Sequence, residues 1–137
     1  MIEFKDAAYG YGGQELLTQM NVSLAPGSFH FLTGPSGAGK TTFLKLCYHE
    51  LQATAGRVSI LGKDSRALER DDVAMLRRKI GVVHQDCQFL DHLSVWENIS
   101  LPLTVSGRPI VESDLADLMA WVGLSDHANA LPPEMSG

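Results

Sequence analysis

The chain has 137 residues, of which 45% are hydrophobic, and this is enough for one domain with a hydrophobic core. Its net charge of -5, from 11 basic and 16 acidic residues, argues against a surface that binds nucleic acid. Two cysteines favour a reducing, cytoplasmic compartment, and no apolar run reaches the roughly 18 residues of a membrane helix, so we expect no direct membrane insertion.

The N-terminal segment predicts a small antiparallel β unit. Ile2 and Phe4 alternate with polar residues, the glycines around Tyr11 supply a turn, and a second strand leads to another turn at 25–27. Tyr9 and Tyr11 fall in the first turn on this prediction. An exposed aromatic ring there could stack on an adenine, and a packing role is the alternative for either ring.

An apolar segment of strand type, 29–33, is followed by a glycine-rich turn and then by a helical repeat. Gly34, Gly39, Lys40 and Thr41 fit the pattern G-x-x-x-x-G-K-[ST] of a phosphate-binding P-loop, and a strand before and a helix after are the context that this pattern requires. The alternative is a glycine-rich turn that only joins a strand to a helix.

The residue types of this segment suit the binding of a magnesium nucleotide. Small residues let successive backbone amides converge on an anion, and the helix N-terminus adds the positive end of its dipole. Lys40 would reach the β- and γ-phosphates, and the Thr41 hydroxyl would ligate Mg²⁺. The predicted nucleotide-binding residues are Gly34, Pro35, Ser36, Gly37, Ala38, Gly39, Lys40, Thr41 and Thr42.

The middle of the chain predicts further strands and a charged helix. Cys47 falls on the apolar face of the helix after the P-loop, so we expect it in the core. A strand follows over 57–61, a charged helix over 65–78, and a second strand over 80–84 that ends at Gln85. Open α/β sheets place ligand contacts at the carboxyl ends of strands, so Gln85 is a candidate metal or water ligand; an ordinary loop position is the alternative.

The last third of the chain predicts helices. Ser94 and Glu97 form a capping-box pattern at the start of a helix that we expect Pro102 to stop. Four apolar residues at helical spacing predict a second, amphipathic helix that ends near Gly123; they are Leu115, Leu118, Met119 and Val122. Together these helices predict a helical subdomain.

These features resemble the ATP-binding subunit of ABC systems and, within that family, the bacterial cell-division ATPases of the FtsE type. The likeness covers the whole chain, and the stretches 31–40, 76–83 and 96–103 carry it. It implies an α/β fold of the P-loop NTPase class, of which this sequence holds the N-terminal half. We expect one partial ATP-binding domain, with an antiparallel β subdomain and P-loop core over 1–88 and the helical subdomain over 89–137.

The resemblance also implies roles for individual residues. Tyr11 would stack on the adenine of ATP, with Tyr9 as the fallback. Gln85 would contact Mg²⁺ and the attacking water, and would face a membrane partner. Lys40 and Gln85 are then the candidate catalytic residues, and Thr41 and Gln85 the candidate metal ligands.

Ser136 and Gly137 would begin the signature motif, which in this family contacts the γ-phosphate of the nucleotide held by the other subunit. Two residues depart from the family pattern. His84 stands where phenylalanine is usual before the Q-loop glutamine, and Met135 where the signature motif usually has leucine. We interpret His84 as a packing substitution rather than a pH sensor.

The family places a Walker B aspartate, a catalytic glutamate and a switch histidine after the signature motif, where this sequence stops. We interpret the sequence as truncated or partial, and expect it to bind ATP without efficient hydrolysis. We also expect an unpaired apolar edge beside the P-loop strand, because the strands that should follow are missing from the sequence.

The expected function is that of an FtsE-like ATPase, which couples ATP binding and hydrolysis to an FtsX-like membrane protein in cell division. It would form a head-to-tail homodimer on binding ATP, and would lie in the cytoplasm on the inner face of the plasma membrane. The alternatives are an exporter subunit of the lipoprotein-release or macrolide-efflux type, another P-loop enzyme such as a kinase or GTPase, and a nucleotide-binding module without catalysis. No guanine-recognising Asn-Lys-x-Asp tetrapeptide occurs.

Overall fold

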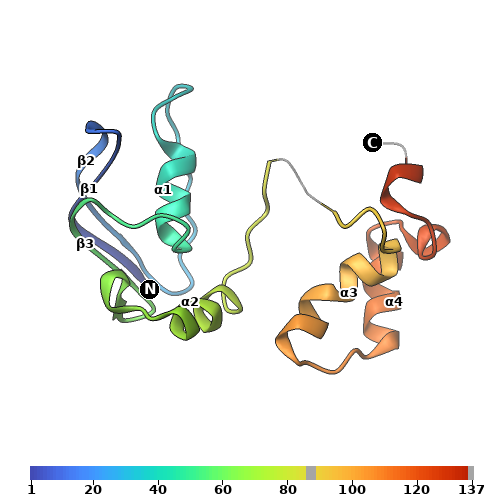
Figure 1. The fold of residues 1–137 in the computed structure, drawn as a ribbon. Coiled ribbons are helices and arrows are strands. Elements are labelled where there is room, and N and C mark those ends of the chain that lie inside the picture. The colour runs from blue at the N-terminus through green and yellow to red at the C-terminus, as the bar shows by residue number, and fades with distance from the viewer. Residues whose placement is uncertain (86–88, 136–137) are drawn as a thin grey trace. The chain divides into compact units, whose positions relative to one another are not determined.

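The computed structural model describes residues 1–85 and 89–135, and the chain divides into two compact units, Met1–Gly81 and Val82–Gly137. The first unit combines an antiparallel sheet with two helices, and the second is helical (Figure 1). The expected subdomain boundary between residues 88 and 89 stays a prediction. Within the described ranges, no helix combines the length and the apolar character needed to cross a membrane.

The first unit is built on a four-stranded antiparallel sheet in the order β2-β1-β3-β4. Its strands are β1 (Ile2–Tyr11), β2 (Gln14–Leu24), β3 (Ala55–Ile60) and β4 (Lys63–Asp64). β1 lies at the centre, where Phe4 is opposite Val22 of β2 and Val58 of β3. The prediction of an antiparallel β subdomain is therefore confirmed.

β1 is irregular where it passes Asp6, which has a positive φ of 46° and lies between register shifts with both neighbouring strands. Asn21 of β2 closes one side: its Oδ1 accepts a hydrogen bond of 3.0 Å from the Asp6 backbone N–H, and its Nδ2 donates one of 2.9 Å to the Asp6 carboxylate. On the other side, a Cβ built on Gly56 would lie 2.0 Å from the Asp6 carbonyl oxygen. Only glycine fits at residue 56 without moving β1.

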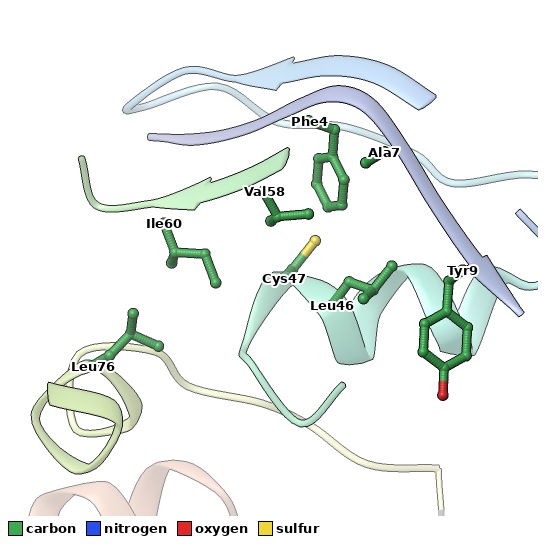
Figure 2. Packing of buried hydrophobic residues seen from close by; sticks show 8 residues of the cluster. All are labelled: Phe4, Ala7, Tyr9, Leu46, Cys47, Val58, Ile60 and Leu76. Carbon is green, nitrogen blue, oxygen red and sulfur yellow. The ribbon is translucent and has the colours of Figure 1, made fainter. Parts of the chain in front are cut away.

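Two helices pack against one face of this sheet, α1 (Lys40–Cys47) and α2 (Arg70–Arg77). Figure 2 shows Leu46 and Cys47 of α1 facing the strands, and Leu76 of α2 near Ile60. The buried cluster is Phe4, Ala7, Tyr9, Leu46, Cys47, Val58, Ile60 and Leu76. Cys47 lies in this core, as predicted.

The single charged helix predicted over 65–78 is split in two. A short 3₁₀ helix, η1 (Ser65–Ala67), begins where the Asp64 side chain accepts a hydrogen bond of 3.0 Å from the Arg66 backbone N–H. α2 then begins from its own capping box, formed by Glu69 and Asp72. Two caps five residues apart start two helices, and the apolar spacing alone does not reveal the interruption.

The prediction of strands over 29–33 and 80–84 is wrong, because neither segment forms a strand in the structure. Most of their side chains are exposed, with 81% for Phe29, 84% for Phe31 and 95% for Val83, whereas Ile80 packs partly against the core. A strand requires a neighbour that satisfies its backbone N–H and C=O groups. None of the described residues supplies one for either segment, so β propensity alone does not produce a strand there.

The described residues of the second unit form two helices and two short 3₁₀ helices: α3 (Val95–Ser106), α4 (Glu112–Trp121), η2 (Ser125–His127) and η3 (Pro132–Glu134). The predicted amphipathic helix is α4, but only half of its predicted apolar face is covered. Leu115 and Met119 are buried, whereas Leu118 and Val122 are exposed. The segment after α4 returns to the start of α3, where the Val95 backbone N–H donates to the Ala130 carbonyl over 2.9 Å.

α3 begins as predicted and ends later than predicted. The Ser94 hydroxyl accepts from the Glu97 backbone N–H over 3.2 Å, and the Glu97 carboxylate accepts from the Ser94 N–H over 2.7 Å, so the capping box is confirmed. Pro102 does not stop the helix, which continues to Ser106 and ends at Gly107, with φ 69°. An interior proline costs about 3 kcal/mol, so it disfavours a helix without excluding one, and α3 continues through Pro102.

Candidate functional site

The segment from Gly34 to Lys40 forms a tight turn that leads directly into α1. Three glycines supply its positive φ angles, 149° at Gly34, 80° at Gly37 and 85° at Gly39, and Gly39 is the N-cap of the helix. Side chains disfavour such angles, which explains the glycines. The turn and the helix of the P-loop pattern are therefore present, although the segment before them is not a strand.

Lys40 folds back over this turn. Its Nζ donates a hydrogen bond of 2.8 Å to the Gly34 carbonyl and one of 2.6 Å to the Pro35 carbonyl. No carboxylate among the described residues forms an ion pair with this ammonium. The positive charge is thus held beside the curled backbone without a negative partner from that part of the chain, as an anion site requires.

The first turn of α1 adds unpaired backbone N–H groups and the positive end of the helix dipole. Thr41 is exposed, whereas Thr42 is buried, so the Thr41 hydroxyl is the one open to a metal ion. Mg²⁺ usually takes few protein ligands and fills its octahedron with phosphate oxygens and water. One hydroxyl beside a phosphate cradle therefore fits a magnesium nucleotide.

β2 holds the turn in place through Gly39. A Cβ built on Gly39 would lie 2.7 Å from Cδ2 of Leu17 and 3.3 Å from Cγ of Leu16, so the backbone of the turn lies directly against these side chains. An open groove of about 320 Å³ runs beside this contact, lined by β2, the segment 30–33 and the start of α1. The phosphate cradle thus rests on the sheet on one side and borders a largely apolar groove.

Tyr9 and Tyr11 lie in β1 and not in the turn after it, which corrects the predicted position. Tyr9 is 9% exposed and belongs to the core, whereas Tyr11 is 55% exposed. The two rings meet edge to face, with centroids 4.9 Å apart. Burial of Tyr9 removes it as the fallback for base stacking and leaves Tyr11 as the available ring.

The remaining predicted residues lie in the second unit or outside the described residues. Gln85 is exposed and belongs to the second unit, so its contact with Mg²⁺ stays a prediction. Ser136 and Gly137 lie outside the described residues, and their role in the signature motif also stays a prediction. His84, the departure beside Gln85, is exposed.

Sequence reasoning missed a polar cluster at the end of α1. Lys45 Nζ lies 2.7 Å from Glu50 Oε1, and the Tyr48 hydroxyl donates to Glu50 Oε2 over 2.8 Å. Lys45 and Glu50 are five residues apart, which is not a contact spacing on a helix. They meet because the chain leaves the helix at Tyr48 and turns through His49, whose φ is 58°. No local sequence pattern predicts a left-handed histidine.

Comparison with known proteins gives a consistent result for the whole chain. The model of the ABC transporter family matches residues 17–137. The cell division ATP-binding protein FtsE of Bacillus subtilis (strain 168) is 36% identical over 140 residues, which cover 100% of this chain and 61% of the relative. The methionine import ATP-binding protein MetN of Xylella fastidiosa (strain Temecula1) is also 36% identical, over 143 residues that cover 100% of this chain and 43% of the relative.

Solved structures agree with this result. A dimeric ATP-binding cassette in a post-hydrolysis state, bound to ADP and Pi, superimposes with a TM-score of 0.80 and 28% identity. The superposition covers 99% of this chain and 63% of that one. The chain therefore spans about three fifths of the length of the FtsE relative and of this cassette.

Proposed function

Because the chain belongs to the ABC transporter family, whose model matches residues 17–137, we propose that it binds MgATP as the ATP-binding subunit of an FtsE-like complex. In this complex, ATP binding and hydrolysis are coupled to an FtsX-like membrane partner in cell division. One observation carries the nucleotide site: the ammonium of Lys40 lies over the curled turn on the carbonyls of Gly34 and Pro35, without a carboxylate partner in the described part of the chain.

Each residue of the turn has a role in this proposal. The backbone from Gly34 to Thr42 surrounds the phosphates, and Lys40 neutralises charge on the β- and γ-phosphates. Thr41 offers its hydroxyl to Mg²⁺, and Tyr11 offers its exposed ring to the adenine. The bound MgATP supplies the phosphoanhydride bond that is hydrolysed.

Hydrolysis is proposed for the whole protein, in a head-to-tail dimer. Gln85 contacts Mg²⁺ and the attacking water, and Ser136 and Gly137 of one copy approach the γ-phosphate held by the other. The dimeric relative bound to ADP and Pi supports both the reaction and the dimer. The subdomain division at residues 88 and 89, and a cytoplasmic position on the inner face of the membrane, belong to the same proposal.

A second candidate is the ATP-binding subunit of an importer. The observation in its favour is that MetN matches this chain with the same 36% identity as FtsE, and that both matches cover the whole of this chain. Co-purification from membranes separates the two candidates. An FtsX-like partner supports the division role, and a transporter permease as partner supports import.

The nucleotide site is tested by replacing Lys40 with alanine and titrating the protein with a fluorescent ATP analogue in the presence of Mg²⁺. One charge-assisted hydrogen bond is worth roughly 1.5 to 3 kcal/mol, so affinity should fall by about tenfold or more. Lys5→Ala, which removes a cation from an exposed position in β1, is the matched control and should bind normally. Equal affinities for the Lys40→Ala variant and the unchanged protein would refute the assignment.

A further inference from the structure

An ion pair lies at the end of α1, the helix that follows the phosphate-binding turn. Lys45 Nζ and Glu50 Oε1 are 2.7 Å apart, and the side chains are 34% and 40% exposed. The Tyr48 hydroxyl holds the other carboxylate oxygen of Glu50 at 2.8 Å. Both charged groups are therefore held in position and remain accessible to a ligand.

The backbone also fixes this pair. The Glu50 N–H donates to the Lys45 carbonyl over 2.8 Å, and the left-handed conformation of His49 brings the chain back over the last turn of α1. Glu50 thus faces Lys45 from a rigid turn and not from a mobile tail. A preorganised pair loses less side-chain entropy when it binds a ligand.

The position of the pair follows the expected course of a nucleotide along α1. Lys45 lies five residues after Lys40, about 7.5 Å along the helix axis from the phosphate-binding end. It shares a helix face with Thr41, four residues before it. Tyr11 lies toward the same part of α1, because its ring is 4.9 Å from that of Tyr9, and Tyr9 belongs to the same buried cluster as Leu46, the residue after Lys45. A nucleotide with its phosphates on the P-loop and its base on Tyr11 would bring the base edge to this pair.

We propose that Lys45 and Glu50 recognise the edge of the adenine base that stacks on Tyr11. The Glu50 carboxylate accepts a hydrogen bond from the exocyclic amino group, and the Lys45 ammonium donates one to the neighbouring ring nitrogen, N7. Adenine presents this donor and acceptor side by side, whereas guanine presents two acceptors on the same edge. The pair therefore selects adenine against guanine. This inference rests on the proposed function, because the P-loop must first hold the phosphates.

Calorimetric titration with MgATP, MgGTP and magnesium tripolyphosphate tests the inference. The unchanged protein should bind MgATP about tenfold more tightly than MgGTP, the effect of one charge-assisted hydrogen bond. Lys45→Met and Glu50→Gln should each bring the ratio of the two affinities close to one. Neither variant should change the affinity for tripolyphosphate, which contacts the P-loop alone.

Two matched variants complete the design. Lys45→Arg keeps a cation and should keep the preference for MgATP, whereas Lys63→Met removes the cation of a separate ion pair with Asp72 and should change nothing. If the unchanged protein does not distinguish MgATP from MgGTP, or if the Lys45→Met variant still does, this inference is overturned while the nucleotide site stands. Failure of the unchanged protein to bind tripolyphosphate would instead overturn the nucleotide site. If Lys45→Met does not fold, Glu50→Gln decides the question.

Discussion

Arg77 joins α2 to the end of α1, because its guanidinium donates a hydrogen bond of 3.1 Å to the backbone carbonyl of His49. The His49 side chain is only 7% exposed, and its Nδ1 has no hydrogen-bond partner among the described residues. Burial, and secondarily the charge of Arg77, lowers the pKa of His49 below its ordinary value of 6.5. The junction of the two helices therefore depends on a neutral imidazole beside a permanent cation.

Because His49 is buried in its neutral form at this junction, we predict that the protein loses stability as the pH falls below about 6.5. The unfolded chain protonates His49 near that pH and the folded chain only at lower pH, so the unfolded state binds more protons between the two pKa values. The loss of stability levels off once the pH is below the pKa of His49 in the folded protein. Urea unfolding at several pH values checks this: His49→Gln should flatten the dependence, whereas His92→Gln, at an exposed position, should not.

Gly56→Ala should destabilise the protein far more than Gly62→Ala. Both glycines have positive φ, 67° and 84°, so both substitutions carry a conformational cost of about 1 kcal/mol or more. A Cβ at residue 56 would also lie 2.0 Å from the Asp6 carbonyl oxygen, whereas a Cβ at residue 62 meets open space. We expect a loss above about 3 kcal/mol for Gly56→Ala, measured by urea unfolding. Similar losses for the two variants would show that the contact with Asp6 is unimportant.

Cys47 should be inert in the folded protein. Burial raises the pKa of its thiol to about 12, so almost no thiolate, the reactive form, is present near neutral pH. In a Cys87→Ser background, Ellman's reagent should label Cys47 only at the rate of unfolding, and immediately in concentrated urea. Rapid labelling in native buffer would place Cys47 outside the core.

Ser94→Ala should weaken the second unit by about 1 kcal/mol, because it removes the hydroxyl that caps α3. The hydrogen bonds from Ser94 also lower the pKa of Glu97. The stability that this capping box contributes is therefore present above the ordinary pKa of a glutamate and is lost as the pH falls through the lowered pKa of Glu97. Helix content followed by circular dichroism during unfolding measures both effects. Ser113→Ala, near the start of α4, serves as the control, and an equal loss there would contradict the capping role.

Local features of this chain were predictable from sequence, because their causes lie within a few residues. The turn before α1 follows from Gly34 and Gly39, and the start of α3 follows from Ser94 and Glu97, where the hydrogen-bonding groups are three residues apart. Pro102 shows the limit of such reasoning. A proline inside a helix is disfavoured but not excluded, so the expected stop did not follow from the residue type alone.

Pairing over long distances was not predictable in the same way. The segments 29–33 and 80–84 have the composition of strands, yet a strand exists only with a neighbour. The cluster of Lys45 and Glu50 depends on a left-handed conformation at His49, which is uncommon for any residue other than glycine even though histidine adopts it more often than most. The sequence therefore predicts the phosphate-binding turn but not the polar pair at the far end of the same helix.

The contact of Gly39 with Leu17 has a consequence for protein engineering. A library that varies the phosphate-binding turn alone would meet two obstacles at residue 39, since a side chain there would displace the Leu17 side chain and would have to adopt a φ of 85°. Co-variation with smaller residues at 16 and 17 would relieve the collision but not the backbone strain. Directed evolution of nucleotide preference is therefore better aimed at the other end of α1, where substitutions leave this junction intact.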